Sequence, residues 1–96
     1  MDMSNEELII EYKESLNEGY ILKLIKRFEY VLKKLQCEIS DEIMMTIYND
    51  FDNIIYRSVI NYDYDENYEF ELYLKHELNR IVLLYGDYES RIDTLF

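Results

Sequence analysis

Apolar residues recur along this chain at spacings of three and four, which is the period of an amphipathic α-helix. The clearest case lies within residues 20–36, where one face holds Ile21, Leu24, Ile25, Phe28, Val31, Leu32 and Leu35. No glycine or proline interrupts that stretch, and its lysines and arginine fall on the other side. The pattern predicts one continuous helix over residues 20–36.

An earlier helix is predicted to begin after Ser4. Ser4 and Glu7 form the S-x-x-E pattern of a capping box, in which each side chain bonds to the other residue's backbone N–H. The apolar residues that follow at helical spacing are Leu8, Ile9, Tyr12 and Leu16. The turn-forming residues 17–19 are expected to end this helix.

A long helix is predicted after Ser40, whose hydroxyl is suited to cap it, and it is expected to end near Asn61 or Tyr62. Its predicted buried stripe is Ile43, Met44, Ile47, Phe51, Ile54, Ile55 and Val59. An acidic corner follows at residues 63–67, because Asp and Asn favour turns.

The last main helix is predicted from about residue 68 to residue 85. Its predicted stripe is Phe70, Tyr73, Leu74, Leu78, Ile81, Val82 and Tyr85. Residues 87–96 are expected to add a short C-terminal helix. With 96 residues, no proline and two glycines, the chain is predicted to be one all-α domain over residues 1–96: a compact bundle of four main helices plus the short one.

The charge is strongly acidic, at −11, and is unevenly distributed. Residues 38–77 hold most of the acids, whereas the basic residues gather in the helix predicted over residues 20–36. DNA affinity comes largely from cations that neutralise phosphates, so strong unaided DNA binding is not expected. The basic stripe fits a phosphate or an acidic protein surface, but an ordinary exposed helix face is the preferred interpretation.

The chain is expected to be cytoplasmic. Cys37 is the one cysteine, so no intrachain disulfide can form. No apolar run approaches the ~18 residues of a membrane span, and the N-terminal residues lack the basic and apolar regions of a signal peptide.

Neither a metal site nor a catalytic site is expected, and no cofactor is implied. The acidic corner resembles the start of an EF-hand loop, but Tyr68 stands where that loop needs glycine and Leu74 where it needs a bidentate Glu. His76 has no partner at zinc-ligand spacing, and Cys37 follows an apolar stripe as a small buried residue would. We therefore expect that the protein is not an enzyme. Eleven tyrosines exceed what a small core holds, so some are expected at a contact surface.

The stretch of residues 46–50 reads Thr-Ile-Tyr-Asn-Asp, and Phe70 and Tyr73 open the last helix. These features resemble region 2 of bacterial sigma factors, where a polar helix with a D-L-x-Q-E pattern precedes a helix of the form F-S-T-Y-A-x-x-W-I-R-x-x-I. The match runs ungapped over residues 45–82. Residues 6–20 and 24–35 also resemble the opening helices of that region, so the likeness covers nearly the whole chain.

The resemblance implies a sigma region 2-like fold and a role in transcription. In that family, the polar face of the first helix grips the coiled-coil clamp of the RNA polymerase β′ subunit, and the next helix reads and melts the −10 promoter element. The residues at the gripping positions are Thr46, Asn49, Asp50, Asn53 and Tyr56. Phe70 and Tyr73 stand at promoter-melting positions.

The promoter-facing half departs from the family. Acids replace the basic link, and His76-Glu77 replaces the paired tryptophans. The set that would face nucleic acid is Asp65, Glu66, Glu69, Phe70, Tyr73, His76 and Glu77. Its carboxylates would repel phosphate, so the polymerase-binding side is the better preserved one.

The first hypothesis is a stand-alone phage or mobile-element protein without region 4, which binds the clamp as one subunit of a split sigma factor or as a modulator. The alternative is an acidic anti-defence inhibitor, comparable to an anti-CRISPR protein. It would imitate nucleic acid with the carboxylates of residues 38–77 and block a basic groove of its target. A third reading is self-association through the tyrosines.

Overall fold

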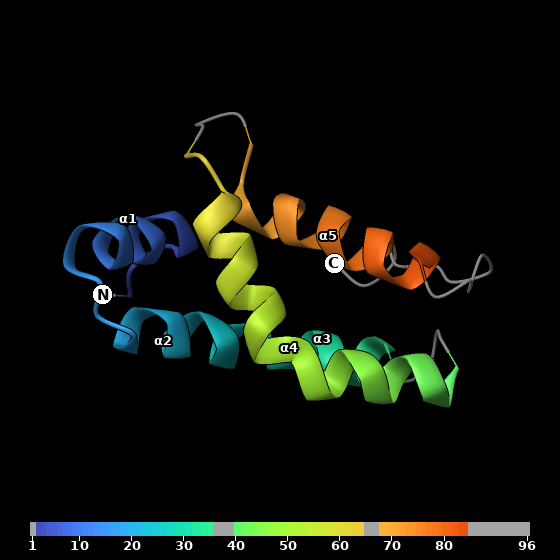
Figure 1. The fold of residues 1–96 in the computed structure, drawn as a ribbon. Helices are drawn as coiled ribbons and strands as arrows, with labels where there is room; N and C mark the ends of the chain where they lie inside the picture. Colours follow the sequence, from blue (N-terminus) through green and yellow to red (C-terminus); the bar gives the residue numbers. More distant parts are fainter. Residues whose placement is uncertain (1, 36–39, 65–67, 85–96) are drawn as a thin grey trace.

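The computed structural model describes residues 2–35, 40–64 and 68–84, which form five helices. They are α1 (Asn5–Ser15), α2 (Gly19–Arg27), α3 (Glu29–Leu35), α4 (Asp41–Asn61) and α5 (Phe70–Leu84). The all-helical class is thus confirmed. α4 runs through the middle of the molecule, where it packs against α2, α3 and α5, while α1 packs against α2 and α5 (Figure 1).

The predicted capping box starts α1. The Glu7 N–H donates to the Ser4 hydroxyl at 3.0 Å, and the Ser4 N–H donates to the Glu7 carboxylate at 3.3 Å. Leu16 differs from the prediction, because its side chain is 71% exposed and its backbone takes the left-handed conformation (φ 58°) that closes the helix. A residue in that conformation leaves the helical face, so Leu16 turns away from Leu8, Ile9 and Tyr12.

The helix predicted over residues 20–36 is divided in two at Phe28. Its backbone (φ −99°, ψ 5°) leaves the α-helical region, and its N–H is shared between the carbonyl oxygens of Leu24 and Ile25. The Val31 N–H then bonds to the Phe28 carbonyl at 3.0 Å, which is the i+3 pattern of a tighter turn. Apolar residues spaced by three suit this turn and an α-helix equally, so periodicity did not reveal the break.

α4 agrees closely with its prediction. Ser40 caps it through the Ile43 N–H, it ends at Asn61, and every member of the predicted stripe is buried. The helix bends partway along its length (Figure 1). The Ser58 hydroxyl donates to the Ile54 carbonyl at 2.7 Å, a type of side-chain bond that often bends helices.

α5 begins at Phe70, later than predicted, after a corner held by one local and one long-range hydrogen bond. The buried Tyr62 donates its hydroxyl to the Tyr68 carbonyl. The Phe70 N–H, one of the backbone donors without a partner inside the helix, donates to the Glu6 carboxylate at 2.8 Å. α1 thereby caps α5.

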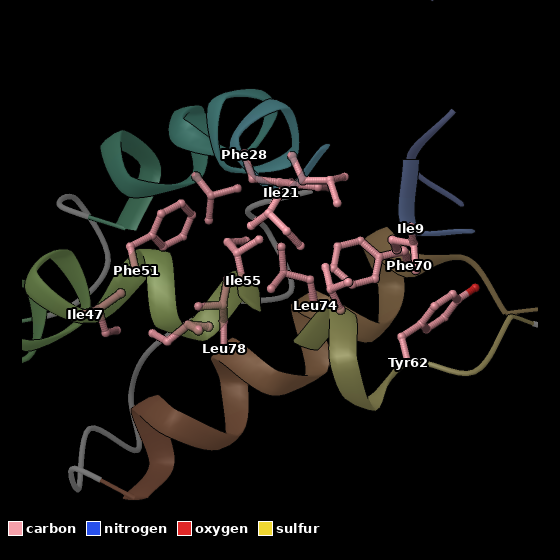
Figure 2. Close-up of a cluster of buried hydrophobic side chains, with 14 of the residues drawn as sticks. Ile9, Ile21, Phe28, Ile47, Phe51, Ile55, Tyr62, Phe70, Leu74 and Leu78 are labelled. Atoms are coloured by element: carbon pink, nitrogen blue, oxygen red, sulfur yellow. The ribbon is translucent and has the colours of Figure 1, made fainter. Parts of the chain in front are cut away.

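An aromatic cluster joins the corner to the rest of the core. The Phe70 ring lies 5.4 Å from the Tyr62 ring and 5.9 Å from the Phe28 ring, both edge to face, and stacks on Tyr73 at 6.3 Å. Figure 2 shows Phe70 beside Leu74 among the buried side chains. The predicted C-terminal helix, Tyr85 and Cys37 lie outside the described residues.

Candidate protein-binding site on α4

The five residues predicted to grip a partner lie on one face of α4. Residues 46, 49, 50, 53 and 56 are spaced by three, one, three and three, which places them within one side of an α-helix. Thr46, Asn49, Asn53 and Tyr56 are exposed, and Asp50 is half-buried. The core stripe of α4 occupies the opposite side, so this polar face is open to a partner.

Asp50 is the centre of a small polar network on this face. One of its carboxylate oxygens lies 3.1 Å from the Arg57 guanidinium, and the other accepts from the Asn53 side-chain amide at 3.0 Å. Arg57 also donates to the Asn53 carbonyl at 3.4 Å. Because the pair is largely exposed, it contributes at most about 1 kcal/mol to stability. A partner's cation can therefore join or displace Arg57 at small cost.

Tyr56 is held in place at the other end of the face. Its hydroxyl lies 3.4 Å from the Tyr12 hydroxyl, and the two rings meet edge to face at 6.2 Å. The hydrogen bond with Tyr56, followed by burial, raises the pKa of Tyr12 above its ordinary value. An aromatic ring fixed in this way loses little conformational freedom when it binds a partner.

The polar face forms a ridge between two hollows. A cleft of about 470 Å³ lies between α4 and α5, where Arg57 and Arg80 sit above an apolar floor that includes Ile54 and Ile81. On the other side, a groove of about 720 Å³ lies between α4 and the α2–α3 pair. Asp50 borders the cleft, and Asn49 and Asn53 border the groove.

The residues predicted to face nucleic acid do not share one surface, because some of them are buried and others are exposed. Phe70 has no exposed surface and belongs to the core, so its placement on a surface was wrong. Tyr73 is half-buried against the core, and burial, with a smaller effect of Glu77, raises the pKa of its hydroxyl. The physical reason is the 3.6-residue period, which puts Phe70 and Tyr73 on the same side of α5 as Leu74.

Among the remaining members of that set, the three that the structure describes are polar residues at or near the surface: Glu69, His76 and Glu77. Glu69 is exposed. His76 is exposed and its Nδ1 lies 3.0 Å from the Tyr68 hydroxyl, while Glu77 pairs with Arg80 at 2.9 Å. Asp65 and Glu66 lie outside the described residues. Over the described part of the chain, no three His, Cys, Asp or Glu side chains are grouped in a way that would hold a metal ion.

Several surface residues of α4 were not predicted as site residues. Arg57 was placed outside the buried stripe, but its bond to Asp50 seven residues earlier was not foreseen. Large exposed apolar side chains also belong to this surface, among them Met45 at 59% and Tyr48 at 62% exposure. Met45 and Tyr48 lie outside the buried stripe predicted for α4, and this was the feature of the sequence that could have indicated their exposure.

Comparison with protein-family models, with curated proteins and with solved structures found no match. Among the helices of the described residues, none has the length and apolar character needed to cross a membrane.

Proposed function

We propose that this chain is a protein-binding module of the transcription machinery, which grips the β′ clamp of RNA polymerase with the polar face of α4. It acts as a sigma region 2-like subunit or as a modulator that occupies the clamp. The supporting observation is the single exposed face that carries Thr46, Asn49, Asp50, Asn53 and Tyr56. The identity of the partner rests on the resemblance of residues 45–82 to sigma region 2.

The chemistry of the face suits a basic, helical partner. Asp50 offers a carboxylate, the two asparagines offer both donors and acceptors, and Tyr56 offers a fixed aromatic ring. The charge of −11 favours encounter with a basic surface. Residue types of this kind can hydrogen-bond to an exposed coiled coil without a deep pocket.

The burial of Phe70 supports a protein-binding role over a promoter-melting role. A residue without exposed surface cannot stack on a base unless the core opens, and Tyr73 is half-buried beside it. We therefore propose that this chain leaves promoter recognition to a partner subunit, or prevents it.

Capture of core RNA polymerase by the tagged chain tests the proposal. Asp50→Arg reverses the charge at the centre of the face and should reduce capture at least tenfold. The matched control is Glu14→Arg, which makes the same charge change on the exposed surface of α1 and should leave capture intact. Equal capture of polymerase by both variants, or no capture by the wild type, would contradict the clamp proposal.

A second candidate function is an acidic inhibitor that imitates nucleic acid, as some phage anti-defence proteins do. The observation in its favour is that Glu6 of α1 reaches the start of α5, next to Glu69 and Glu71. Carboxylates from two separate segments thus collect at one corner, as phosphates collect along a nucleic acid. The target would be a basic nuclease or another nucleic-acid-binding protein.

Salt dependence and charge reversal test this candidate. Binding to a basic nuclease should weaken steeply as salt rises, and the triple reversal of Asp65, Glu66 and Glu69 should weaken it further. A triple reversal of Asp2, Glu14 and Glu18 makes the same total charge change outside residues 38–77 and serves as the control. Binding that does not change with salt, or that both triple variants weaken equally, would rule out a mimic centred on this corner.

A further inference from the structure

The groove between α4 and the α2–α3 pair has an apolar floor and a charged rim. Ile25 and Leu32 are half-buried on its floor, and the exposed Tyr48 stands at its edge. Its volume of about 720 Å³ lies in the range of pockets that hold a ligand or the anchor side chains of a partner. The break at Phe28 sets the direction of α3 and therefore the shape of this groove.

The rim of the groove carries two carboxylates and one lysine, with Glu29 and Lys33 on α3 and Asp52 on α4. The side chains of Glu29 and Asp52 make no hydrogen bond or ion pair with any described residue, and both border the same hollow. Asp50, on the ridge beside them, is already engaged by Arg57 and Asn53. An incoming cation therefore meets unoccupied acceptors at Asp52 and Glu29.

The apolar surface continues along α4 on both sides of Asp52. Four large apolar side chains on α4 are at least 42% exposed: Met45, Tyr48, Tyr56 and Ile60. Together with Asp52, which lies between Tyr48 and Tyr56, they recur every three or four residues. This is the i, i+3, i+7, i+11, i+15 pattern of a helix contact surface. Its midpoint falls at residue 52 or 53.

That midpoint argues against a second copy of this chain as the occupant. In a symmetric antiparallel pair of α4 helices, Asp52 of each copy would meet Asp52 of the other, and like charges placed together are destabilising. Each copy also carries a net charge of −11. Nucleic acid is disfavoured as well, because its phosphates would face Asp52 and Glu29 above an apolar floor.

We propose that this groove binds an amphipathic helix of another protein, which places apolar side chains on Ile25 and Leu32 and a lysine or arginine against Asp52. The surface adjoins the polar face of α4, so the inference deepens the proposal that α4 binds a partner. It rests on that proposal but does not depend on RNA polymerase being the partner. Charge at one position, Asp52, then decides which helices bind.

Two synthetic helical peptides test the inference. They carry leucines on one face over about 18 residues and are identical except for a central lysine or glutamate. In fluorescence anisotropy titrations with the full chain, the lysine peptide should bind about threefold to tenfold more tightly than the glutamate peptide. Asp52→Lys should reverse that preference, and Glu14→Lys should leave it unchanged.

A floor variant separates groove binding from charge attraction. Leu32→Ala should weaken both peptides by a similar factor and leave their ratio unchanged, since it removes apolar contact and no charge. Failure of both peptides to bind, equal affinity for the two, or a preference that Asp52→Lys does not move would each overturn the inference. The inference would also be overturned if the chain dimerised in a concentration-dependent way and Tyr48→Glu abolished the dimer, because a second copy would then occupy the groove.

The two proposals fail separately. Asp50→Arg should leave the ratio of the two peptide affinities unchanged while it reduces capture of polymerase at least tenfold. If Asp52→Lys reverses the preference between the two peptides and polymerase is not captured, the clamp proposal fails and the groove proposal is supported. If polymerase is captured through Asp50 and the peptides show no charge preference, the groove proposal fails alone.

Discussion

Replacing Phe70 by alanine tests the finding that this residue belongs to the core. Its side chain has no exposed surface, and its ring contacts the rings of Phe28, Tyr62 and Tyr73 at centroid distances of 5.4–6.3 Å. If Phe70 instead lay on an outer face ready to stack on a base, its removal would cost little stability. The two placements therefore predict different free energies of unfolding.

The expected loss follows from the packing. A buried Phe→Ala change costs about 3–5 kcal/mol, and each lost aromatic pair adds roughly 0.5–1.5 kcal/mol beyond the buried area. A domain of this length has a total stability of about 5–14 kcal/mol. We expect Phe70→Ala to lose at least about 4 kcal/mol, which lowers the urea midpoint by roughly 2–3 M for an m-value near 1.5 kcal/mol/M.

Urea unfolding followed by far-UV circular dichroism measures this loss. Tyr64→Ala is the control, because Tyr64 is 54% exposed and its removal should cost less than about 0.5 kcal/mol. If Phe70→Ala does not fold, Phe70→Leu should still lose about 1–2 kcal/mol. A loss below about 1 kcal/mol for Phe70→Ala would refute the assignment of Phe70 to the core.

Three further predictions concern the caps and the tyrosines. Ser4→Ala should lower the free energy of unfolding by about 0.5–2 kcal/mol in the same urea experiment, since it removes the N-cap of α1, and an unchanged midpoint would contradict the cap. Glu6→Gln should cost about 1 kcal/mol, because a neutral amide accepts the Phe70 N–H less strongly than a carboxylate, and Glu6→Ala should cost more than Glu6→Gln. Burial and then Glu71 raise the pKa of Tyr30 from its ordinary value of 10.0, so a ¹³C-tyrosine NMR titration should show that Glu71→Gln lowers this pKa part of the way back. The unfolded chain ionises such a tyrosine first, so the urea midpoint should fall as the pH rises above about 10, and a midpoint that stays constant there would contradict the raised pKa.

The elements governed by local chemistry were predictable from the sequence. The serine caps of α1 and α4 depend on one hydroxyl and a nearby N–H, and both were found where the sequence placed them. The break at Phe28 and the exposure of Leu16 were not predictable, because each depends on a backbone angle that leaves the apolar spacing unchanged. For Phe70, helical periodicity predicted burial correctly, whereas the family resemblance pointed to a surface.

The candidate site was predictable only within α4. Spacing alone places Asp50 and Asn53 on one face, because residues three apart in a helix are neighbours. The groove could not be foreseen, since it depends on how α3 lies against α4 after the break at Phe28. The cap that Glu6 provides for α5 could not be foreseen either, because Glu6 and Phe70 are 64 residues apart in the sequence.

A photo-crosslinking amino acid placed at position 49 tests the central claim most directly. Asn49 is exposed in the middle of the polar face and its side chain makes no hydrogen bond with any described residue, so its replacement removes no internal side-chain hydrogen bond. Leu22, exposed on α2, is the control position. We predict that the probe at position 49 crosslinks to the clamp of the β′ subunit in the presence of core RNA polymerase, and that the probe at position 22 does not. No β′ crosslink from position 49, or equal crosslinking from both positions, would contradict the claim that this face of α4 binds the clamp.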